Sequence, residues 1–190
     1  MKRKVLVVLG HPDSVGFNQE IFKTYVESLD RNQSEVKTLE LGKMKFDPVL
    51  RYGYRKFMKP DAEIEKSQEL LKWADKIVFI YPIWFSSMPS LLKGWIDRVM
   101  TPGFAYNMKS FFRHDGHLAG RPAELIMTSD GPGFYYKFIA PTPTKLMKNH
   151  ILKLCGIKVK KVRIFGLTGS SSDERRAKFL DKVAKGAKNA

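Results

Sequence analysis

The most constraining feature of the sequence is a buried strand that ends abruptly in a proline and two large aromatic residues. The run Ile77-Val78-Phe79-Ile80 is continuously apolar and largely β-branched, which is typical of a strand covered on both faces of a parallel sheet. Pro82 has no backbone N–H and ends regular pairing. From Ser90 the apolar residues return at helical spacing. The stretch therefore predicts a strand, an aromatic loop and a helix in succession.

The rest of the chain repeats this alternation of strands and helices. Strands are predicted over residues 5–9, 35–41, 76–81, 122–128 and 159–167, and helices over residues 18–29, 61–73, 90–99, 144–155 and 172–187. Such alternation indicates one doubly wound α/β domain of 190 residues, with right-handed crossovers and helices on both faces of a five-stranded parallel sheet. We expect the flavodoxin-like strand order 2-1-3-4-5.

The net charge of +15 is the most unusual bulk property of the chain. It would attract nucleic acid, anionic membranes or phosphate-bearing ligands. The lysines are nevertheless spread along the sequence, with modest clustering at residues 158–161 and in the last helix, so a solvated lysine surface is the simpler interpretation. No zinc-ligand spacing, helix–turn–helix or RNA-binding signature accompanies the charge. We expect neither a metal nor a nucleic-acid partner.

The single cysteine, Cys155, excludes an internal disulfide and fits a reducing compartment. We interpret it as a small buried residue in a helix, with a reactive thiol as the alternative. The apolar run near the N-terminus is too short for a signal peptide, and no stretch approaches the ~20 apolar residues that span a bilayer. We therefore expect a cytoplasmic protein without membrane insertion.

Three loops of unusual composition follow the first, third and fourth strands. They comprise residues 10–18, 82–89 and 128–136. In the strand order 2-1-3-4-5 the first and third strands are neighbours, and ligands bind at the carboxyl ends of the strands where the order reverses. The three loops are therefore predicted to surround one binding site.

The first loop has the chemistry of an anion site. It ends at a helix N-terminus, where unpaired N–H groups and the helix dipole favour negative charge. Ser14 and Asn18 can add donors, Gly16 lets the backbone approach closely, and His11 can hydrogen-bond a phosphate oxygen. Each has a simpler alternative: Ser14 and Asn18 as helix caps, and His11 as an ordinary loop histidine.

The second and third loops have the chemistry of a site for a flat ring. The second offers Trp84 and Phe85 for stacking and backbone N–H groups for a polar ring edge; its alternative is an aromatic plug of the core. The third loop supplies hydroxyl groups and glycine backbone, at Thr128, Ser129, Gly131 and Tyr136. Its alternative is a capped turn. Together the loops favour a flavin nucleotide over a nicotinamide cofactor held by a G-x-G-x-x-G fingerprint, which is absent.

In these motifs and their order the chain resembles the flavodoxin-like NAD(P)H:quinone oxidoreductases, including the regulatory oxidoreductases of bacterial potassium efflux systems. The resemblance covers nearly the whole chain. It rests on Gly10-His11-Pro12 with Ser14, Phe17 and Asn18; Phe46-Asp47-Pro48; Gln68; Pro82-Ile83-Trp84-Phe85; Leu92-Lys93-Gly94-Trp95; Asp97-Arg98-Val99; Gly103-Phe104-Ala105-Tyr106; and Thr128-Ser129 with Gly131.

The resemblance implies that the chain binds FMN or FAD, a choice that it leaves open. The phosphate side of the flavin would contact His11, Ser14, Phe17, Asn18 and Gln68. The isoalloxazine would be framed by Pro82, Ile83, Trp84 and Phe85, with backbone donors near its N5 and O4. The pyrimidine edge would contact Thr128, Ser129, Gly131 and Tyr136.

The resemblance further implies an enzyme that passes hydride from NAD(P)H through flavin N5 to a quinone or a similar electrophile. It implies a homodimer, with residues 42–60 and 106–120 at the interface. A flavoprotein that binds and controls a potassium efflux system is the alternative. The animal enzymes carry a histidine six residues beyond the tyrosine matched by Tyr136, and this chain has Thr142 there. Tyr136, or water, would have to relay the proton, so Tyr136 is the candidate catalytic residue.

Overall fold

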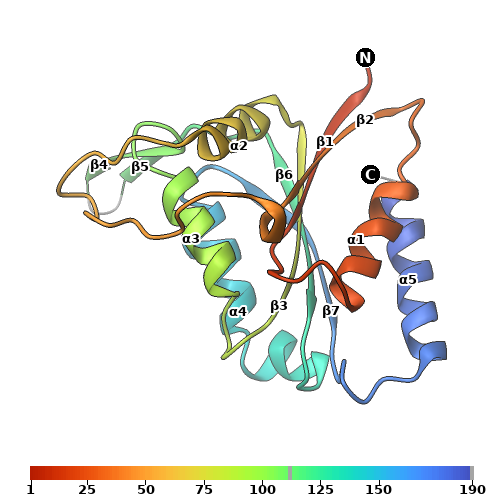
Figure 1. The fold of residues 1–190 in the computed structure, drawn as a ribbon. Helices are drawn as coiled ribbons and strands as arrows, with labels where there is room; N and C mark the ends of the chain where they lie inside the picture. Colours follow the sequence, from red (N-terminus) through yellow and green to blue (C-terminus); the bar gives the residue numbers. More distant parts are fainter. Residues whose placement is uncertain (111–112, 189–190) are drawn as a thin grey trace.

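The computed structural model describes residues 1–110 and 113–188. Its centre is a five-stranded parallel sheet in the order β2-β1-β3-β6-β7 (Figure 1). The strands are β1 (Arg3–Leu9), β2 (Ser34–Glu40), β3 (Lys76–Pro82), β6 (Pro122–Thr128) and β7 (Lys158–Phe165). The predicted order is confirmed. Because β1 pairs with β2 on one side and with β3 on the other, the winding reverses between β1 and β3.

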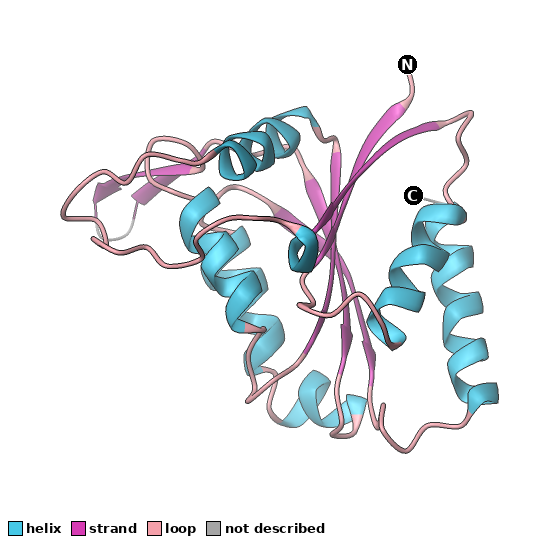
Figure 2. Cartoon of the chain, in the orientation of Figure 1, coloured by secondary structure: helices cyan, strands magenta, loops and turns pink. Residues whose placement is uncertain are grey.

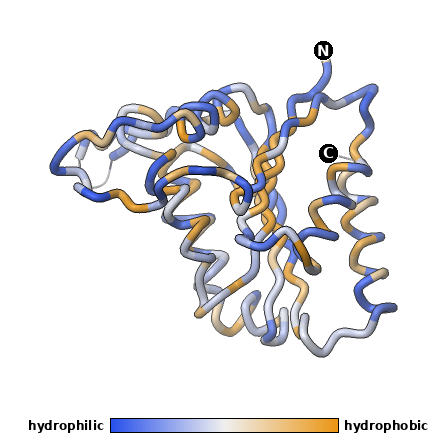
Figure 3. Tube along the Cα trace, in the orientation of Figure 1, coloured by the Kyte–Doolittle hydropathy of each residue, from blue (hydrophilic) through white to orange (hydrophobic). Residues whose placement is uncertain are grey.

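Helices cover both faces of the sheet, as predicted (Figure 2). One face carries α1 (Phe17–Glu27) and α5 (Asp173–Lys188), and the other carries α2 (Ala62–Trp73), α3 (Ser90–Val99) and α4 (Thr142–Lys145) with the π-helical turn η3 (Leu146–Leu152). Successive side chains of β1 alternate between the two layers: Leu6 packs under α2 and α3, and Val7 under α1 and α5. Figure 3 shows the resulting concentration of apolar residues along the strands. Two further short turns are η1 (Leu41–Lys43) and η2 (Tyr135–Ile139).

The ends of the helices only partly follow the prediction. Asp61 caps α2 as expected, because its Oδ1 accepts the N–H of Ile64 at 3.0 Å. The helix predicted over residues 144–155 begins earlier, at Thr142, because Pro143 suits a first helical turn. It then continues as η3 and is followed by Gly156 in a left-handed conformation, with φ of 83°.

The connection over residues 106–120 contains a β-hairpin that was not predicted. Its strands, β4 (Tyr106–Ser110) and β5 (Arg113–Gly116), pair antiparallel. Both are polar and largely exposed, so they lack the apolar alternation by which a strand is recognised. An ion pair between Lys109 and Asp115, at 2.6 Å, lies across the hairpin.

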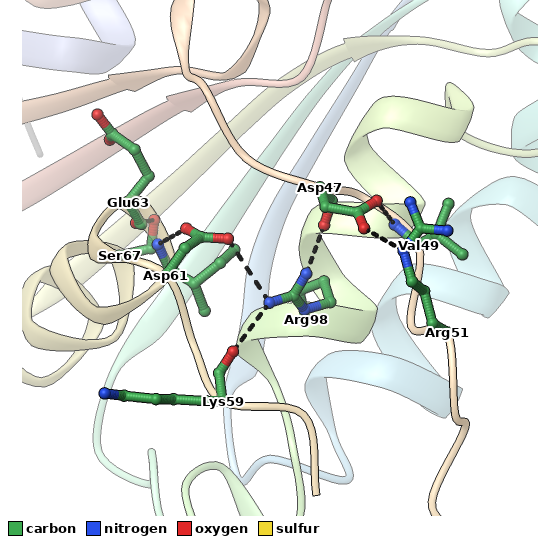
Figure 4. Close-up of polar contacts among 9 residues, drawn as sticks. Asp47, Val49, Arg51, Lys59, Asp61, Glu63, Ser67 and Arg98 are labelled. Carbon is green, nitrogen blue, oxygen red and sulfur yellow. Dashed lines mark hydrogen bonds and ion pairs between the residues drawn. The ribbon is translucent and has the colours of Figure 1, made fainter. Parts of the chain in front are cut away.

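Residues 44–60 contain no helix or strand, yet α3 holds both ends of the segment (Figure 4). The contact is made by Arg98, which is only 3% exposed. Its guanidinium donates to the carbonyl oxygen of Asp47 at 2.6 Å and to that of Lys59 at 3.4 Å, and it lies 3.6 Å from Asp61 Oδ2. One buried cation therefore satisfies backbone groups that a long loop would otherwise leave unpaired.

A glycine on the same helix lets this segment pack closely. A Cβ added at Gly94 would lie 2.5 Å from Pro48 Cβ, which is closer than real Cβ contacts. Beside it, the Asp47 carboxylate accepts the N–H of Val49 and the Nε–H of Arg51. These hydrogen bonds, the backbone one first, lower the pKa of Asp47. The Phe46-Asp47-Pro48 motif therefore packs against α3 at Gly94.

A buried carboxylate lies toward the amino edge of the sheet. Glu124 on β6 is 2% exposed, and its Oε2 accepts the hydroxyl of Tyr25 and the ammonium of Lys76, each at 3.3 Å. Its Oε1 lies 2.9 Å from Arg163 Nη1. Burial, and then Glu124, raises the pKa of Tyr25, while burial lowers the pKa of Lys76. Each charged side chain of this network has a partner of opposite charge within it, with one carboxylate facing two cations.

Cys155 is buried as predicted, although it lies just past η3. Burial raises the pKa of its thiol to about 12, which opposes the reactive alternative. Across residues 1–110 and 113–188, no helix combines the length and the apolar character needed to cross a bilayer.

Candidate functional site

The three predicted loops lie together at the carboxyl edge of the sheet and are joined by direct contacts. Asn18 Nδ2 donates to Thr128 Oγ1 at 2.9 Å, which links the first loop to the third. The N–H of Ile83 donates to the Thr128 carbonyl at 2.7 Å, which links the second to the third. The rings of His11 and Trp84 meet edge to face, with centroids 5.6 Å apart. The three loops therefore form one surface.

His11 is oriented by its own loop. Its Nδ1 lies 3.0 Å from the N of Asp13 and 3.2 Å from the carbonyl oxygen of Asp13. The direction of the backbone N–H is fixed and points at Nδ1, so we assign Nδ1 as the acceptor. An acceptor at Nδ1 places the proton of a neutral imidazole on Nε2, so Nε2–H is available to an external acceptor. Ser14 is exposed beside it and makes no hydrogen bond through its side chain within the described chain. His11 thus has the donor that the anion interpretation requires.

The interpretation of Ser14 and Asn18 as helix caps is wrong. The residue before α1 is Gly16, with φ of 106°, and no side chain caps the helix. Asn18 instead lies in the first turn, 8% exposed, and its side chain points across the site toward Thr128. Its Oδ1 is buried and has no partner among the described residues. Without a side-chain cap, the first N–H groups of α1 stay available to an anion.

Phe17 occupies the opposite side of that turn. Its side chain is buried between α1 and α5, with its ring centroid 4.8 Å from that of Phe165 and 6.3 Å from that of Phe179. Only its backbone can therefore face a ligand at the three loops.

The second loop is a tight turn with an unusual backbone. Phe85 and Ser86 both have positive φ, at 46° and 56°. Trp84 and Ser87 close the turn by exchanging two backbone hydrogen bonds of 3.0 and 2.8 Å. Positive φ in a residue other than glycine costs about 1 kcal/mol, and such strain collects at binding sites. The N–H groups of Phe85 and Ser86 have no partner in the part of the chain that the structure describes.

The exposure of this turn rules out an aromatic plug of the core. Trp84 is 43% exposed and the ring of Phe85 is fully exposed. Pro82, the last residue of β3, and Ile83 after it are both buried, and the N–H of Ile83 is already bound. Because the N–H of Trp84 is also taken, the free backbone donors are those of Phe85 and Ser86.

The third loop is partly a self-contained turn. Ser129 is buried, its N–H donates to the Phe165 carbonyl at 2.9 Å, and its hydroxyl donates to the Gly131 carbonyl at 2.8 Å. The alternative of a turn with N-capping is therefore correct only for the turn, because the Ser129 hydroxyl donates to a carbonyl and caps no helix. The ring of Tyr136 lies against Gly131, since a Cβ there would be 3.0 Å from Tyr136 Cε2. Gly131 leaves room for this ring, whose hydroxyl lies beside the loop.

A fourth loop, residues 166–172 after β7, supports the third and was not predicted as part of the site. The hydroxyl of Thr168 donates to the Ser129 carbonyl at 2.9 Å, and the N–H of Leu167 donates to the Gly131 carbonyl at 3.1 Å. Leu167 adopts a φ of 55°. The run Gly166-Leu167-Thr168-Gly169-Ser170-Ser171 resembles the other loops in composition, and this was the signal that could have found it.

Gln68 is not brought to the three loops of its own chain. It lies on α2, and its Nε2 donates to the carbonyl of Val99, the last residue of α3, at 3.1 Å. Because α3 begins at Ser90, just after the second loop, Val99 is about 13 Å along the helix from it.

The combined surface offers both unpaired donors and flat groups. The donors are His11 Nε2, the first N–H groups of α1 and the N–H groups of Phe85 and Ser86. The flat groups are the rings of Trp84, Phe85 and Tyr136. Such a surface suits an anionic group joined to a planar ring that carries acceptors.

Comparisons with known proteins agree with this geometry. Residues 3–187 match the family model described as flavodoxin-like fold. The ribosyldihydronicotinamide dehydrogenase [quinone] of Mus musculus is 30% identical over 92% of this chain and 86% of that protein. The structure of Smu.1420 from Streptococcus mutans UA159 is 38% identical, with a TM-score of 0.85, over 98% of this chain and all of that one.

A third comparison concerns the fold alone. The NAD(P)H:quinone oxidoreductase of Methanothermobacter marburgensis has a TM-score of 0.80 at 24% identity, over 100% of this chain and 96% of that one. The similarity thus spans the whole sheet and all of the loops at its carboxyl edge. The chain therefore belongs to the family of flavodoxin-like fold that includes the NAD(P)H:quinone oxidoreductases, a family of enzymes.

Proposed function

We propose that the protein is a flavin-dependent NAD(P)H oxidoreductase that reduces a quinone or a similar electrophile. The observation that carries the proposal is the set of unpaired donors on the joined loops: His11 Nε2, the start of α1, and the N–H groups of Phe85 and Ser86. Unpaired polar groups on an ordered, partly strained surface are expected where a ligand completes them.

The residues present fit a flavin nucleotide. His11 Nε2–H and the uncapped first turn of α1 would bind a phosphate, with Ser14 beside them. The N–H groups of Phe85 and Ser86 would donate to the polar edge of the ring, and Trp84 would line it. A bound flavin would supply the two-electron chemistry, taking hydride from NAD(P)H at N5 and delivering it to the acceptor.

The remaining residues predicted to contact the flavin would act by holding the loops in place. Thr128 binds Asn18 and Ile83, so it fixes all three loops relative to one another. Ser129 holds the Gly131 carbonyl and the fourth loop. Fixed donors stabilise developing charge without reorganising, which is the main contribution that a protein makes to such chemistry.

Tyr136 is the proposed proton donor, because its hydroxyl lies beside the Gly131 turn. Thr142 is exposed at the start of α4, where the animal enzymes have their histidine, and its hydroxyl is a poor acid at neutral pH. Tyr136→Phe keeps the ring and removes the hydroxyl, so bound flavin should be retained while quinone reduction slows. Tyr135→Phe, on the neighbouring exposed residue, is the matched control.

A homodimer is part of the proposal. Residues 42–60 present exposed apolar side chains, at Val49, Tyr52, Tyr54 and Phe57, and the hairpin adds Met108. Several exposed apolar side chains on one loop favour a protein interface. Gln68 would reach a flavin only from another subunit. Light scattering on a size-exclusion column tests the dimer. A cytoplasmic location remains a prediction from the single buried cysteine.

The first test is the cofactor itself. Mass spectrometry of the material released from purified protein would identify FMN, FAD or neither. Anaerobic titration with NADPH and with NADH should bleach the flavin absorbance, and menadione should restore it. Absence of bleaching would contradict the proposed activity. His11→Leu should weaken flavin retention, and His150→Leu, an exposed histidine on η3, is the control.

A further inference from the structure

A large hollow lies along the edge strand β7, beside the third and fourth loops. Its volume is about 860 Å³. Among the described strands β7 pairs only with β6, so its other edge is free. Four consecutive residues of the strand, Lys161, Val162, Arg163 and Ile164, line the hollow. Because successive side chains point to opposite faces, the hollow wraps around the edge of the strand.

The lining of the hollow is strongly basic. Five cations contribute to it, Lys137, Lys161, Arg163, Arg175 and Lys182, and none of the described lining residues is acidic. Arg163 is matched by Glu124, but Lys161 and Lys182 form no ion pair in the described part of the chain. Their unbalanced charge favours an acidic occupant.

Exposed aromatic rings form one wall. Phe134 and Phe138 are mostly exposed, and Lys137 Nζ lies 5.0 Å from the centre of the Phe138 ring. Apolar rings beside a free strand edge provide pockets for alternate side chains of an added strand.

We propose that the free edge of β7 binds an extended acidic segment of a partner protein, which adds to the sheet as a sixth strand. A free edge offers alternating N–H and C=O groups, which match a polypeptide. A nucleic-acid backbone offers only acceptors and would face the strand carbonyls unpaired. The same edge of a second copy is disfavoured as the occupant, because its described lining would bring five like charges and no acidic residue against this one.

The exposed lysines on β7 fit this role. Lysines on an edge strand normally prevent indiscriminate pairing with other strands. The same charges admit a strand that carries carboxylates at matching positions, so they select the partner as well as protect the edge.

The docking surface also touches the loops of the flavin site. Gly133 of the third loop and Leu167 of the fourth both line the hollow. The inference itself does not depend on the flavin, because it concerns binding at β7.

The test uses the full chain and a fluorescent twelve-residue peptide in which glutamate alternates with valine. Anisotropy should show saturable binding that weakens with salt. A peptide of the same sequence, N-methylated at alternate residues on one edge, should bind at least about tenfold more weakly, because it cannot complete the ladder. The matched lysine–valine peptide should not bind.

Variants locate the site. Lys161→Glu with Lys182→Glu should raise the peptide Kd about tenfold, as expected for two reversed contacts of ~0.7 kcal/mol each. Lys66→Glu with Lys23→Glu reverses two exposed lysines elsewhere and should change it little. The proposal would be overturned if both pairs of variants lost affinity equally, or if the methylated peptide bound as well as the unmodified one. It would also be overturned if the acidic peptide did not bind, or if a single-stranded oligonucleotide bound more tightly at the same lysines.

Discussion

Polar groups are paired differently at the amino ends and at the carboxyl ends of the strands. Toward the amino edge, Glu124 is surrounded by Tyr25, Lys76 and Arg163, so each charged group has a partner of opposite charge within the fold. At the carboxyl edge, Asn18 Oδ1 and the N–H groups of the 85–86 turn have no partner among the described residues. Both regions are ordered and both are rich in polar atoms.

The difference separates structure from function. Polar groups that pair with one another within the fold need no ligand to complete them, and their pairing affects the stability of the folded state. A set of unpaired donors and acceptors on a rigid frame costs stability and is expected to be completed by a ligand. Substitutions at the amino edge should therefore change stability, and those at the carboxyl edge should change ligand binding.

The largest effect is expected at Glu124. Glu124→Ala leaves Lys76 and Arg163 almost buried without their anion, which should lower the free energy of unfolding by about 3 kcal/mol. Urea denaturation measures this, and flavin bound per folded molecule should stay the same. Glu65→Ala, an exposed residue on α2, should cost less than about 0.5 kcal/mol. If Glu124→Ala lowered the free energy of unfolding no more than Glu65→Ala, the contrast between the two ends of the strands would be wrong.

The next effect is expected at Asn18. Asn18→Ala removes the Thr128 hydrogen bond and should cost about 1 kcal/mol of stability. It should raise the Kd of the flavin at least about tenfold, because it loosens the first loop from the third. Fluorescence titration of the flavin-free protein measures this Kd, with the exposed Asn149→Ala as control. Unchanged flavin affinity would assign Asn18 to the fold alone.

Two tyrosines allow a matched test of the same contrast. Tyr25→Phe removes a hydroxyl that binds Glu124 and Lys76, and it should cost between about 1 and 2 kcal/mol. Tyr81, next to Pro82, has a buried hydroxyl without a partner in the described chain. Tyr81→Phe should therefore be neutral or stabilising by up to about 1 kcal/mol. Equal destabilisation of the two variants would show that the Tyr81 hydroxyl is bound.

The smallest effect is expected at the left-handed turn. Ser86→Gly relieves a positive φ and should stabilise the protein by about 0.5 kcal/mol. Because the proposed donor is the backbone N–H, the flavin Kd should change less than about threefold. Thermal unfolding and flavin titration measure the two quantities. A large loss of affinity would instead assign the contact to the serine hydroxyl.

The sheet and its order could be predicted because the strands are long apolar runs and their connections are short and regular. The polar strands β4 and β5 could not be predicted, because they bury almost nothing and show no alternation of apolar residues. The role of Arg98 was also hidden, since its partners are carbonyl groups 39 and 51 residues away, and carbonyl groups have no sequence signal.

At the site, the meeting of the three loops was predictable and their internal geometry was not. The order of the strands alone places the loops together. The turn at Phe85 and Ser86 was unreadable, because neither residue favours positive φ. Asparagine is a residue type that often caps helices, so the sequence suggested a cap at Asn18. The structure shows instead that Gly16 precedes the helix and that the Asn18 side chain binds the Thr128 hydroxyl.

The helix α3 joins the left-handed turn at Phe85 and Ser86 to Arg98, which anchors residues 44–60. The length of the helix sets the distance between them. Ten residues of helix make a rigid spacer of about 15 Å, with the strained turn at one end and the anchored segment 44–60 at the other. Inserting one residue would rotate Arg98 by about 100° and carry its guanidinium away from the carbonyl of Asp47. An insertion or deletion within α3 is therefore expected to uncouple the strained turn from the anchoring of residues 44–60.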